Sequence, residues 1–106
     1  MKAGAYMYAW EFRVAEARLD AFLEAYGETG AWVALFRTAP GYLRTELHRD
    51  RRDPSRFVTL DYWESESAWR RFREERARDF EALDTRCDEL TLEEREIGRF
   101  EPAGRS

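Results

Sequence analysis

The chain has 106 residues, of which 43% are hydrophobic and 15% aromatic, so it suffices for a single small domain with a packed core and suggests no second one. One cysteine excludes an internal disulfide, and one cysteine with one histidine excludes the usual cysteine- and histidine-rich metal sites. A formal net charge of −4, with acidic and basic residues interspersed, argues against nucleic-acid binding. The N-terminus has no long apolar run, which argues against a signal peptide or membrane span, so we expect a cytoplasmic protein.

The first predicted element is a strand over residues 5–14, because aromatic side chains recur there at every second position. The aromatic residues of its one face are Tyr6, Tyr8, Trp10 and Phe12. A helix over 15–26 follows, since its apolar residues return at three- and four-residue spacing. Beyond two glycines, a second short helix is predicted over 31–39 and ends at Pro40-Gly41.

The next two predicted strands, 42–49 and 57–63, form a hairpin through a polar turn. We expect paired residues whose numbers sum to about 105, because this register separates an apolar face from a polar one. It also places Arg44 opposite Asp61 as a pair of opposite charge, with His48 on the same face.

The hydrophobic period changes from two to about 3.6 near residues 64–67, which predicts a strand that runs into a long helix. Ser65 and Ser67 are candidate N-caps of this helix. Arg76 falls on the apolar stripe, which leaves two alternatives open: the helix bends nearby, or Arg76 points into a cavity. Cys87 lies on the same stripe and is expected to be a buried thiol.

Residues 88–94 interrupt the helix, and 95–101 are predicted as the last strand, with a bulge at Gly98 and a flexible tail at 102–106. The order strand, helix, strand, strand, helix, strand predicts an α+β domain of the ferredoxin-like βαββαβ type with a four-stranded antiparallel sheet. Helices can cover only one face of such a sheet. Because both faces carry large side chains, we expect a homodimer.

Four stretches between residues 5 and 102 then stand out together: YAWEFRV, YGETGAWVALFRTAPGYLRTEL, FVTLDYWESESAW and ALDTRCDELTLEEREIGRFE. In these stretches the chain resembles the antibiotic biosynthesis monooxygenase family, whose members are dimeric α/β barrels. That family includes quinone-forming monooxygenases that use neither metal nor flavin, haem-degrading enzymes, and members with no known activity. The resemblance implies the paired barrel and leaves the activity open.

The functional residues of the family match this chain only in part. Trp63 in WES matches the tryptophan of the family's W-x-S motif, and Trp69 stands where quinone-forming members often have a tyrosine. The asparagine that those members place four residues before the tryptophan falls on Thr59. Haem-degrading members use an asparagine, a tryptophan and a histidine. The positions of that tryptophan and histidine correspond to the neighbourhood of Phe72 and Ala82 in this chain. Since the chain has no asparagine, the resemblance argues against haem degradation and leaves the quinone-forming chemistry without its amide donor.

Oxygenation without a cofactor requires a base, a cation or hydrogen-bond donor for the developing anion, and aromatic walls that exclude water. His48 has the ordinary pKa that suits a base, and Arg44 and Asp61 share its predicted face, so these three form the predicted catalytic set. A surface histidine and a structural cross-strand pair are the alternatives. The predicted substrate-binding residues are Trp10, Trp63, Trp69, Tyr62 and Arg76.

Three functions remain open from the sequence. The first is a cofactor-independent monooxygenase that acts on a small aromatic or quinol-like compound. The second is a non-catalytic dimer that binds a small apolar molecule, and the third is an isomerase or cyclase, because acid–base chemistry in the same pocket needs no oxygen. All three imply a homodimer that binds a small apolar or aromatic molecule, without a metal, a cofactor, nucleic acid or a membrane.

Overall fold

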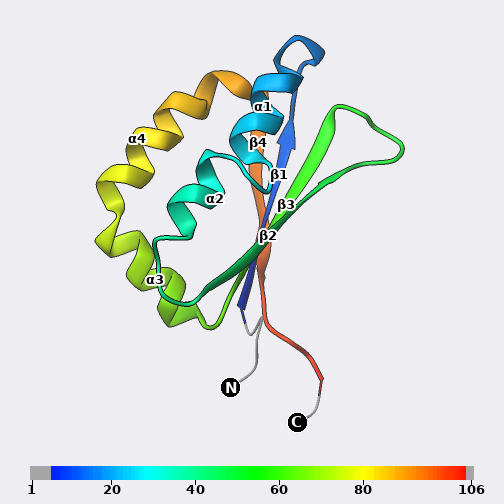
Figure 1. Cartoon of the computed structure of the whole chain (residues 1–106). Coiled ribbons are helices and arrows are strands. Elements are labelled where there is room, and N and C mark those ends of the chain that lie inside the picture. Colours follow the sequence, from blue (N-terminus) through cyan, green and yellow to red (C-terminus); the bar gives the residue numbers. More distant parts are fainter. Residues whose placement is uncertain (1–5, 105–106) are drawn as a thin grey trace.

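The computed structural model describes residues 6–104; Ala5 of the predicted first strand and the last two residues of the predicted tail lie outside this range. A four-stranded antiparallel sheet in the order β2-β3-β1-β4 carries the helices on one face (Figure 1). This confirms the predicted α+β ferredoxin-like fold. The helices and strands are β1 (Tyr6–Arg13), η1 (Glu16–Arg18), α1 (Leu19–Tyr26), α2 (Ala31–Phe36), β2 (Tyr42–Arg49), β3 (Arg56–Trp63), α3 (Glu66–Glu75), α4 (Ala77–Cys87), η2 (Asp88–Leu90) and β4 (Glu93–Phe100).

The core lies between the helices and the sheet and is largely aromatic. Phe12 of β1 packs edge-on against Phe22 of α1, and the Phe22 ring also contacts Phe57 of β3. Phe22 and Trp63 are fully buried, and Cys87 is the buried thiol that the sequence predicts. Side chains that alternate along the strands therefore lock the sheet to the helical layer.

The junction between β3 and α3 forms where the period change predicts it. The Ser65 hydroxyl accepts a hydrogen bond from the backbone N–H of Ala68 at 3.1 Å and so caps the helix. Gly41, just before β2, has a φ of +91°, and a Cβ at this position would stand 2.6 Å from the Cβ of Ala68. The start of β2 is thus held close against α3, which fixes the position of Tyr42.

The long helix bends, as one of the two alternatives predicts. Arg76 has φ −115° and ψ 27°, which separates α3 from α4. Its guanidinium pairs with the carboxylate of Asp79 at 3.0 Å near the protein surface. The other alternative, an Arg76 side chain directed into a cavity, is wrong, because its guanidinium lies near the surface beside Asp79 and does not line the cavity between the sheet and the helices.

The register of the β2–β3 hairpin differs from the prediction. Tyr42 pairs with Trp63 as expected, but the register then shifts before Arg44, so that Thr45 lies opposite Asp61. The cause is a β-bulge, which inserts one extra residue into β2 and moves every later side chain to the other face. Arg44 and Asp61 therefore lie on opposite faces of the sheet.

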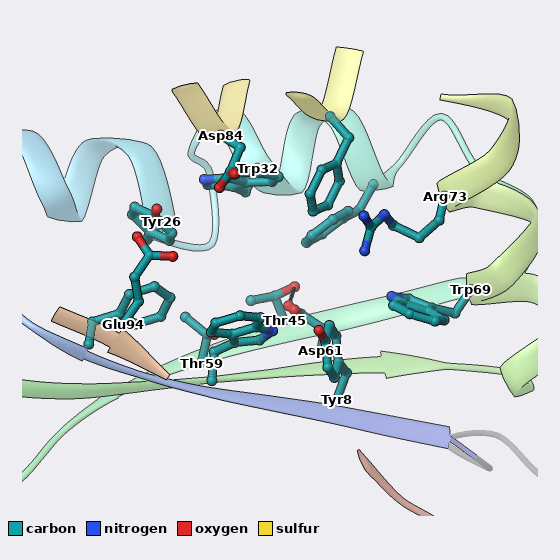
Figure 2. A pocket seen from close by; sticks show the side chains of 14 residues that line it. Tyr8, Tyr26, Trp32, Thr45, Thr59, Asp61, Trp69, Arg73, Asp84 and Glu94 are labelled. Atoms are coloured by element: carbon teal, nitrogen blue, oxygen red, sulfur yellow. Dashed lines mark hydrogen bonds between the residues drawn. The ribbon is translucent and has the colours of Figure 1, made fainter. Parts of the chain in front are cut away.

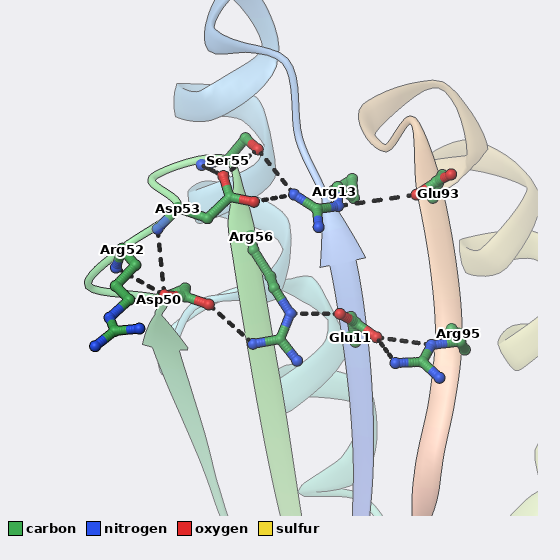
Figure 3. A network of polar contacts seen from close by, with 9 residues as sticks. All are labelled: Glu11, Arg13, Asp50, Arg52, Asp53, Ser55, Arg56, Glu93 and Arg95. Carbon is green, nitrogen blue, oxygen red and sulfur yellow. Dashed lines mark hydrogen bonds and ion pairs between the residues drawn. The ribbon is translucent and has the colours of Figure 1, made fainter.

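The face of the sheet away from the helices is open, and among residues 6–104 no helix covers it (Figure 1). Figure 3 shows a charged network at one end of this face. Its centre is Glu11, whose carboxylate pairs with the guanidiniums of Arg56 and Arg95. These two hydrogen-bonded cations hold the pKa of Glu11 below its usual range.

A second β-bulge lies between β1 and β4. Ala9 pairs with Gly98 and Trp10 with Glu96, so Ile97 is the extra residue beside the glycine that predicts the bulge. Within residues 6–104, no helix has the length and apolar character needed to cross a membrane.

Candidate functional site

A cavity of about 280 Å³ lies between the sheet and the helices (Figure 2). Its volume is close to the lower end of small-molecule sites, which begin at about 300 Å³. The residues that line it from β1, β2 and β3 are Tyr8, Trp10, Phe12, Thr45, Thr59 and Asp61. Those that line it from the helices are Tyr26, Trp32, Phe36, Trp69, Arg73, Phe80 and Asp84, and Glu94 lines it from β4. The walls are thus mainly aromatic, with a few polar groups among them.

Asp61 is the most deeply buried carboxyl of the cavity, with an exposed fraction of 7%. Its Oδ1 accepts a hydrogen bond from the Thr45 hydroxyl at 2.7 Å, and no cation pairs with it among residues 6–104. Loss of hydration raises the pKa of the Asp61 carboxyl to about 6, and the Thr45 hydrogen bond offsets this only in part. A carboxyl with this pKa can accept a proton near neutral pH.

Arg73 supplies the positive charge of the cavity. Its guanidinium carbon lies 3.9 Å from the centre of the Phe80 ring and 5.6 Å from that of Trp69. Figure 2 shows the guanidinium directed into the cavity from α3, on the side where Trp69 and Asp61 lie. Among residues 6–104 it forms no salt bridge. Burial raises the pKa of the Asp84 carboxyl, the Arg73 charge lowers it in part, and that charge is open to an anion bound beside it.

The other end of the cavity is acidic. Asp84 of α4 and Glu94 of β4 line it, and burial raises the pKa of both carboxyls. Burial also raises the pKa of the nearby Tyr26 hydroxyl, which therefore stays protonated. These groups are not arranged as a metal site, since the described residues contain no cluster of three or more metal-binding side chains. This end of the cavity therefore offers hydrogen-bond acceptors to a ligand. It does not hold a deeply buried base like Asp61.

The profile of the antibiotic biosynthesis monooxygenase family matches residues 6–82. The chain belongs to this family. No curated protein matches it. Among solved structures, a variant of SnoaB, a cofactor-independent oxygenase from Streptomyces nogalater, is 23% identical, with a TM-score of 0.75 and 94% of each chain covered.

Two further structures have the same fold as this antibiotic biosynthesis monooxygenase family member. PA3566 from Pseudomonas aeruginosa is 18% identical, with a TM-score of 0.67 over 93% of this chain and 94% of the other. A conserved protein of unknown function from Bacteroides thetaiotaomicron is also 18% identical, with a TM-score of 0.69 over 93% of this chain and 99% of the other. At these identities the likeness establishes the fold.

The structure does not bring the three predicted catalytic residues together. Asp61 lines the cavity, whereas His48 and Arg44 lie on the open face of the sheet. The His48 ring is exposed and lies 3.1 Å from the carboxylate of Glu46. The Arg44 guanidinium stacks 3.8 Å from the centre of the Tyr62 ring. The bulge in β2 causes this separation.

The predicted substrate-binding residues are also divided. Trp10 and Trp69 line the cavity. Tyr62 lies on the open face beneath Arg44, and Arg76 lies outside the cavity next to Asp79. Trp63 is fully buried among Phe36, Tyr42 and Phe72, and its indole N–H has no hydrogen-bond partner in the part of the chain that the structure describes.

Two polar residues to which the structure gives a place beside Asp61 or in the cavity wall, Arg73 and Thr45, were not predicted from the sequence. Arg73 stands four residues after Trp69, and this spacing places both on one helix face. The same four-residue spacing, counted from Phe72, pointed equally to Arg76. Thr45 carried no signal of its own, since the predicted register placed it on the face away from Asp61.

Proposed function

We propose that the protein is a cofactor-independent monooxygenase that acts on a small aromatic or quinol-like compound in this cavity. The observation that supports it most directly is the Asp61 carboxyl, which is buried in an aromatic cavity and free of any cation partner among residues 6–104. Membership of the antibiotic biosynthesis monooxygenase family supports the reaction class. The shared fold with SnoaB, a cofactor-independent oxygenase, adds a precedent for oxygen chemistry on this scaffold.

In this proposal Asp61 takes the hydroxyl proton of a bound phenol. A free phenol has a pKa of about 10, so transfer of its proton to a carboxyl of pKa about 6 is uphill by about 5 kcal/mol without help. The Arg73 guanidinium lowers this cost, because a cation at the cavity wall favours the phenolate. The electron-rich anion then reacts with dioxygen, and the aromatic walls exclude water from it.

The overall reaction balances without an external reductant. With 1-naphthol as a probe, naphthol and dioxygen give 1,4-naphthoquinone and water: one oxygen atom enters the ring, and the other leaves as water with two hydrogens from the substrate. All electrons come from the substrate. The reaction therefore balances without a cofactor as electron donor.

Oxygen consumption with 1-naphthol tests the proposal. We expect uptake by the wild-type protein and a loss of about 10²-fold or more in Asp61→Asn, the range that a general base contributes. Asp20→Asn, the same change at an exposed position of α1, serves as the matched control and should retain the activity. Product formed equally well without oxygen would instead indicate an isomerase or cyclase, and saturable binding without turnover would indicate a binding protein.

We also propose that the protein forms a homodimer through the open face of its sheet. Ile97 and Phe100 of β4 are large apolar residues with exposed fractions of 40% and 45%. Exposed apolar surface of this kind is typical of an interface. Analytical ultracentrifugation at micromolar concentration should give the mass of two chains, and a mass of 12.6 kDa would refute the dimer.

A further inference from the structure

The bulge in β2 has a geometric consequence for the cavity. Along a regular strand, only residues two apart share a face. Because the register shifts between Tyr42 and Arg44, Tyr42 stands opposite Trp63 while Thr45 stands opposite Asp61. Tyr42 and Thr45, three residues apart, therefore lie on the same helix-facing side, and their hydroxyl groups meet.

These hydroxyls form a continuous chain to the buried carboxyl. The Thr45 hydroxyl donates to Asp61 Oδ1 at 2.7 Å, and the Tyr42 hydroxyl lies 2.7 Å from Thr45 Oγ1. A threonine hydroxyl has a single hydrogen, so when it donates to the carboxylate, it can only accept from Tyr42. The chain thus has one polarity while Asp61 is ionised: Tyr42 to Thr45 to Asp61.

We propose that Tyr42 and Thr45 form a proton relay that carries the proton taken up by Asp61 from the cavity to the edge of the sheet. The inference rests on the proposed role of Asp61 as a base. One proton arrives on Oδ2 from the substrate hydroxyl. The protonated carboxyl and the two hydroxyls then rotate, which reverses the polarity of the chain, so that Asp61 donates to Thr45 and Thr45 donates to Tyr42. Asp61 gives its proton to the Thr45 oxygen, Thr45 gives its own to the Tyr42 oxygen, and Tyr42 releases its own to water. No charge is left on either hydroxyl.

Thr45 gives this proton a hydrogen-bonded path away from Asp61. Tyr8 stands opposite Asp61 on β1 and Arg73 lines the same cavity, but among residues 6–104 neither forms a hydrogen bond with the Asp61 carboxyl. An aromatic substrate in the cavity would cover the Oδ2 side. Thr45 is the one hydrogen-bond partner of Asp61 among residues 6–104, and it is itself buried, whereas Tyr42 is half-buried on the edge strand β2.

The relay explains the placement of two hydroxyls that packing alone does not require. A valine has nearly the shape of Thr45, and a phenylalanine would fill the space of the Tyr42 ring between Phe36 and Trp63. A buried hydroxyl without a role in hydrogen bonding is costly. The bulge that joins the two hydroxyls lies next to the cavity, where β-bulges commonly redirect side chains.

The test follows the protonation of Asp61 directly and needs no substrate. The cavity is filled with naphthalene, which has no ionisable group, and the pH is dropped from about 8 to about 5 while infrared absorption of the Asp61 carboxyl is recorded. Asp61→Asn identifies the band. In Thr45→Val and Tyr42→Phe we expect protonation to slow by roughly tenfold or more, and in Thr45→Ser we expect the wild-type rate, since serine keeps the hydroxyl.

Thr85→Val, at an exposed position of α4, is the matched control and should leave the rate unchanged. Wild-type rates in both Thr45→Val and Tyr42→Phe would overturn the relay. The oxygen-uptake assay decides the proposed function separately: activity retained in Asp61→Asn would refute Asp61 as the base, whatever the infrared rates. An inactive Asp61→Asn together with unslowed relay variants would refute the relay alone.

Discussion

Replacing Asp61 by asparagine should stabilise the protein at neutral pH while removing its proposed activity. The carboxyl is 7% exposed, and its pKa rises from an ordinary value of 3.8 to about 6 on folding. Each pKa unit is worth about 1.36 kcal/mol, so ionised Asp61 lowers the free energy of unfolding by about 3 kcal/mol. Asparagine has nearly the same shape and can still accept the Thr45 hydrogen bond through its Oδ1.

The sign follows from proton binding in the two states. Between pH 3.8 and about 6 the folded state holds a proton on Asp61 that the unfolded chain has already lost. The favourable contribution of the neutral carboxyl is therefore complete below pH 3.8 and is lost as the pH rises through about 6. The wild-type protein should lose stability relative to Asp61→Asn across this window and stay at a constant difference above it.

Urea denaturation followed by circular dichroism measures this difference. It should be done at one fixed protein concentration, because any dimerisation changes the apparent stability. We expect a gap that grows from near zero at about pH 4 to about 3 kcal/mol at about pH 8, equivalent to roughly 13 °C in Tm. Asp20→Asn should run parallel to the wild type. Parallel curves for Asp61→Asn and wild type would refute the buried, unpaired carboxyl.

Three further predictions concern α3. Arg73→Met should lower kcat/KM with 1-naphthol by about 10²-fold, the effect of removing one anion-stabilising donor, while Arg71→Met on the exposed face of the same helix should leave it unchanged. Phe72→Ala should reduce the free energy of unfolding by about 3–5 kcal/mol, because it empties a fully buried site; a loss below about 1 kcal/mol in urea denaturation would contradict the packing. Ser65→Ala should cost about 1 kcal/mol by the same measurement, and no loss would mean that the N-cap hydrogen bond is not formed in solution.

The element order was predictable from the sequence because hydrophobic period and cap residues agree at each boundary. The change of period after Trp63, with Ser65 as the cap, located the start of α3. The apolar stripe interrupted at Arg76 indicated the bend, and Gly98 indicated the bulge in β4. In each case a local signal and the tertiary structure point the same way.

The site was less predictable because it depends on the insertion of one extra residue into β2. The bulge at the start of β2 occurs without a glycine, so no residue type announces it, and it exchanges the two faces of the strand. The sequence therefore named Asp61 as a catalytic candidate and placed Arg44 and His48 on its face, whereas in the structure Thr45 is its hydrogen-bond partner and Arg73 lines the same cavity. Which of two arginines faces the cavity depended on the direction of the bend, and periodicity does not give that direction.

Labelled oxygen tests the central claim most directly. Purified protein, freed of metal by a chelator, is given 1-naphthol under ¹⁸O₂, and the quinone and the water are analysed by mass spectrometry. We predict one labelled oxygen atom in the quinone and the other in water, with neither formed by Asp61→Asn. Unlabelled quinone, or the same yield from Asp61→Asn as from the wild type, would contradict a monooxygenase that uses Asp61 as its base.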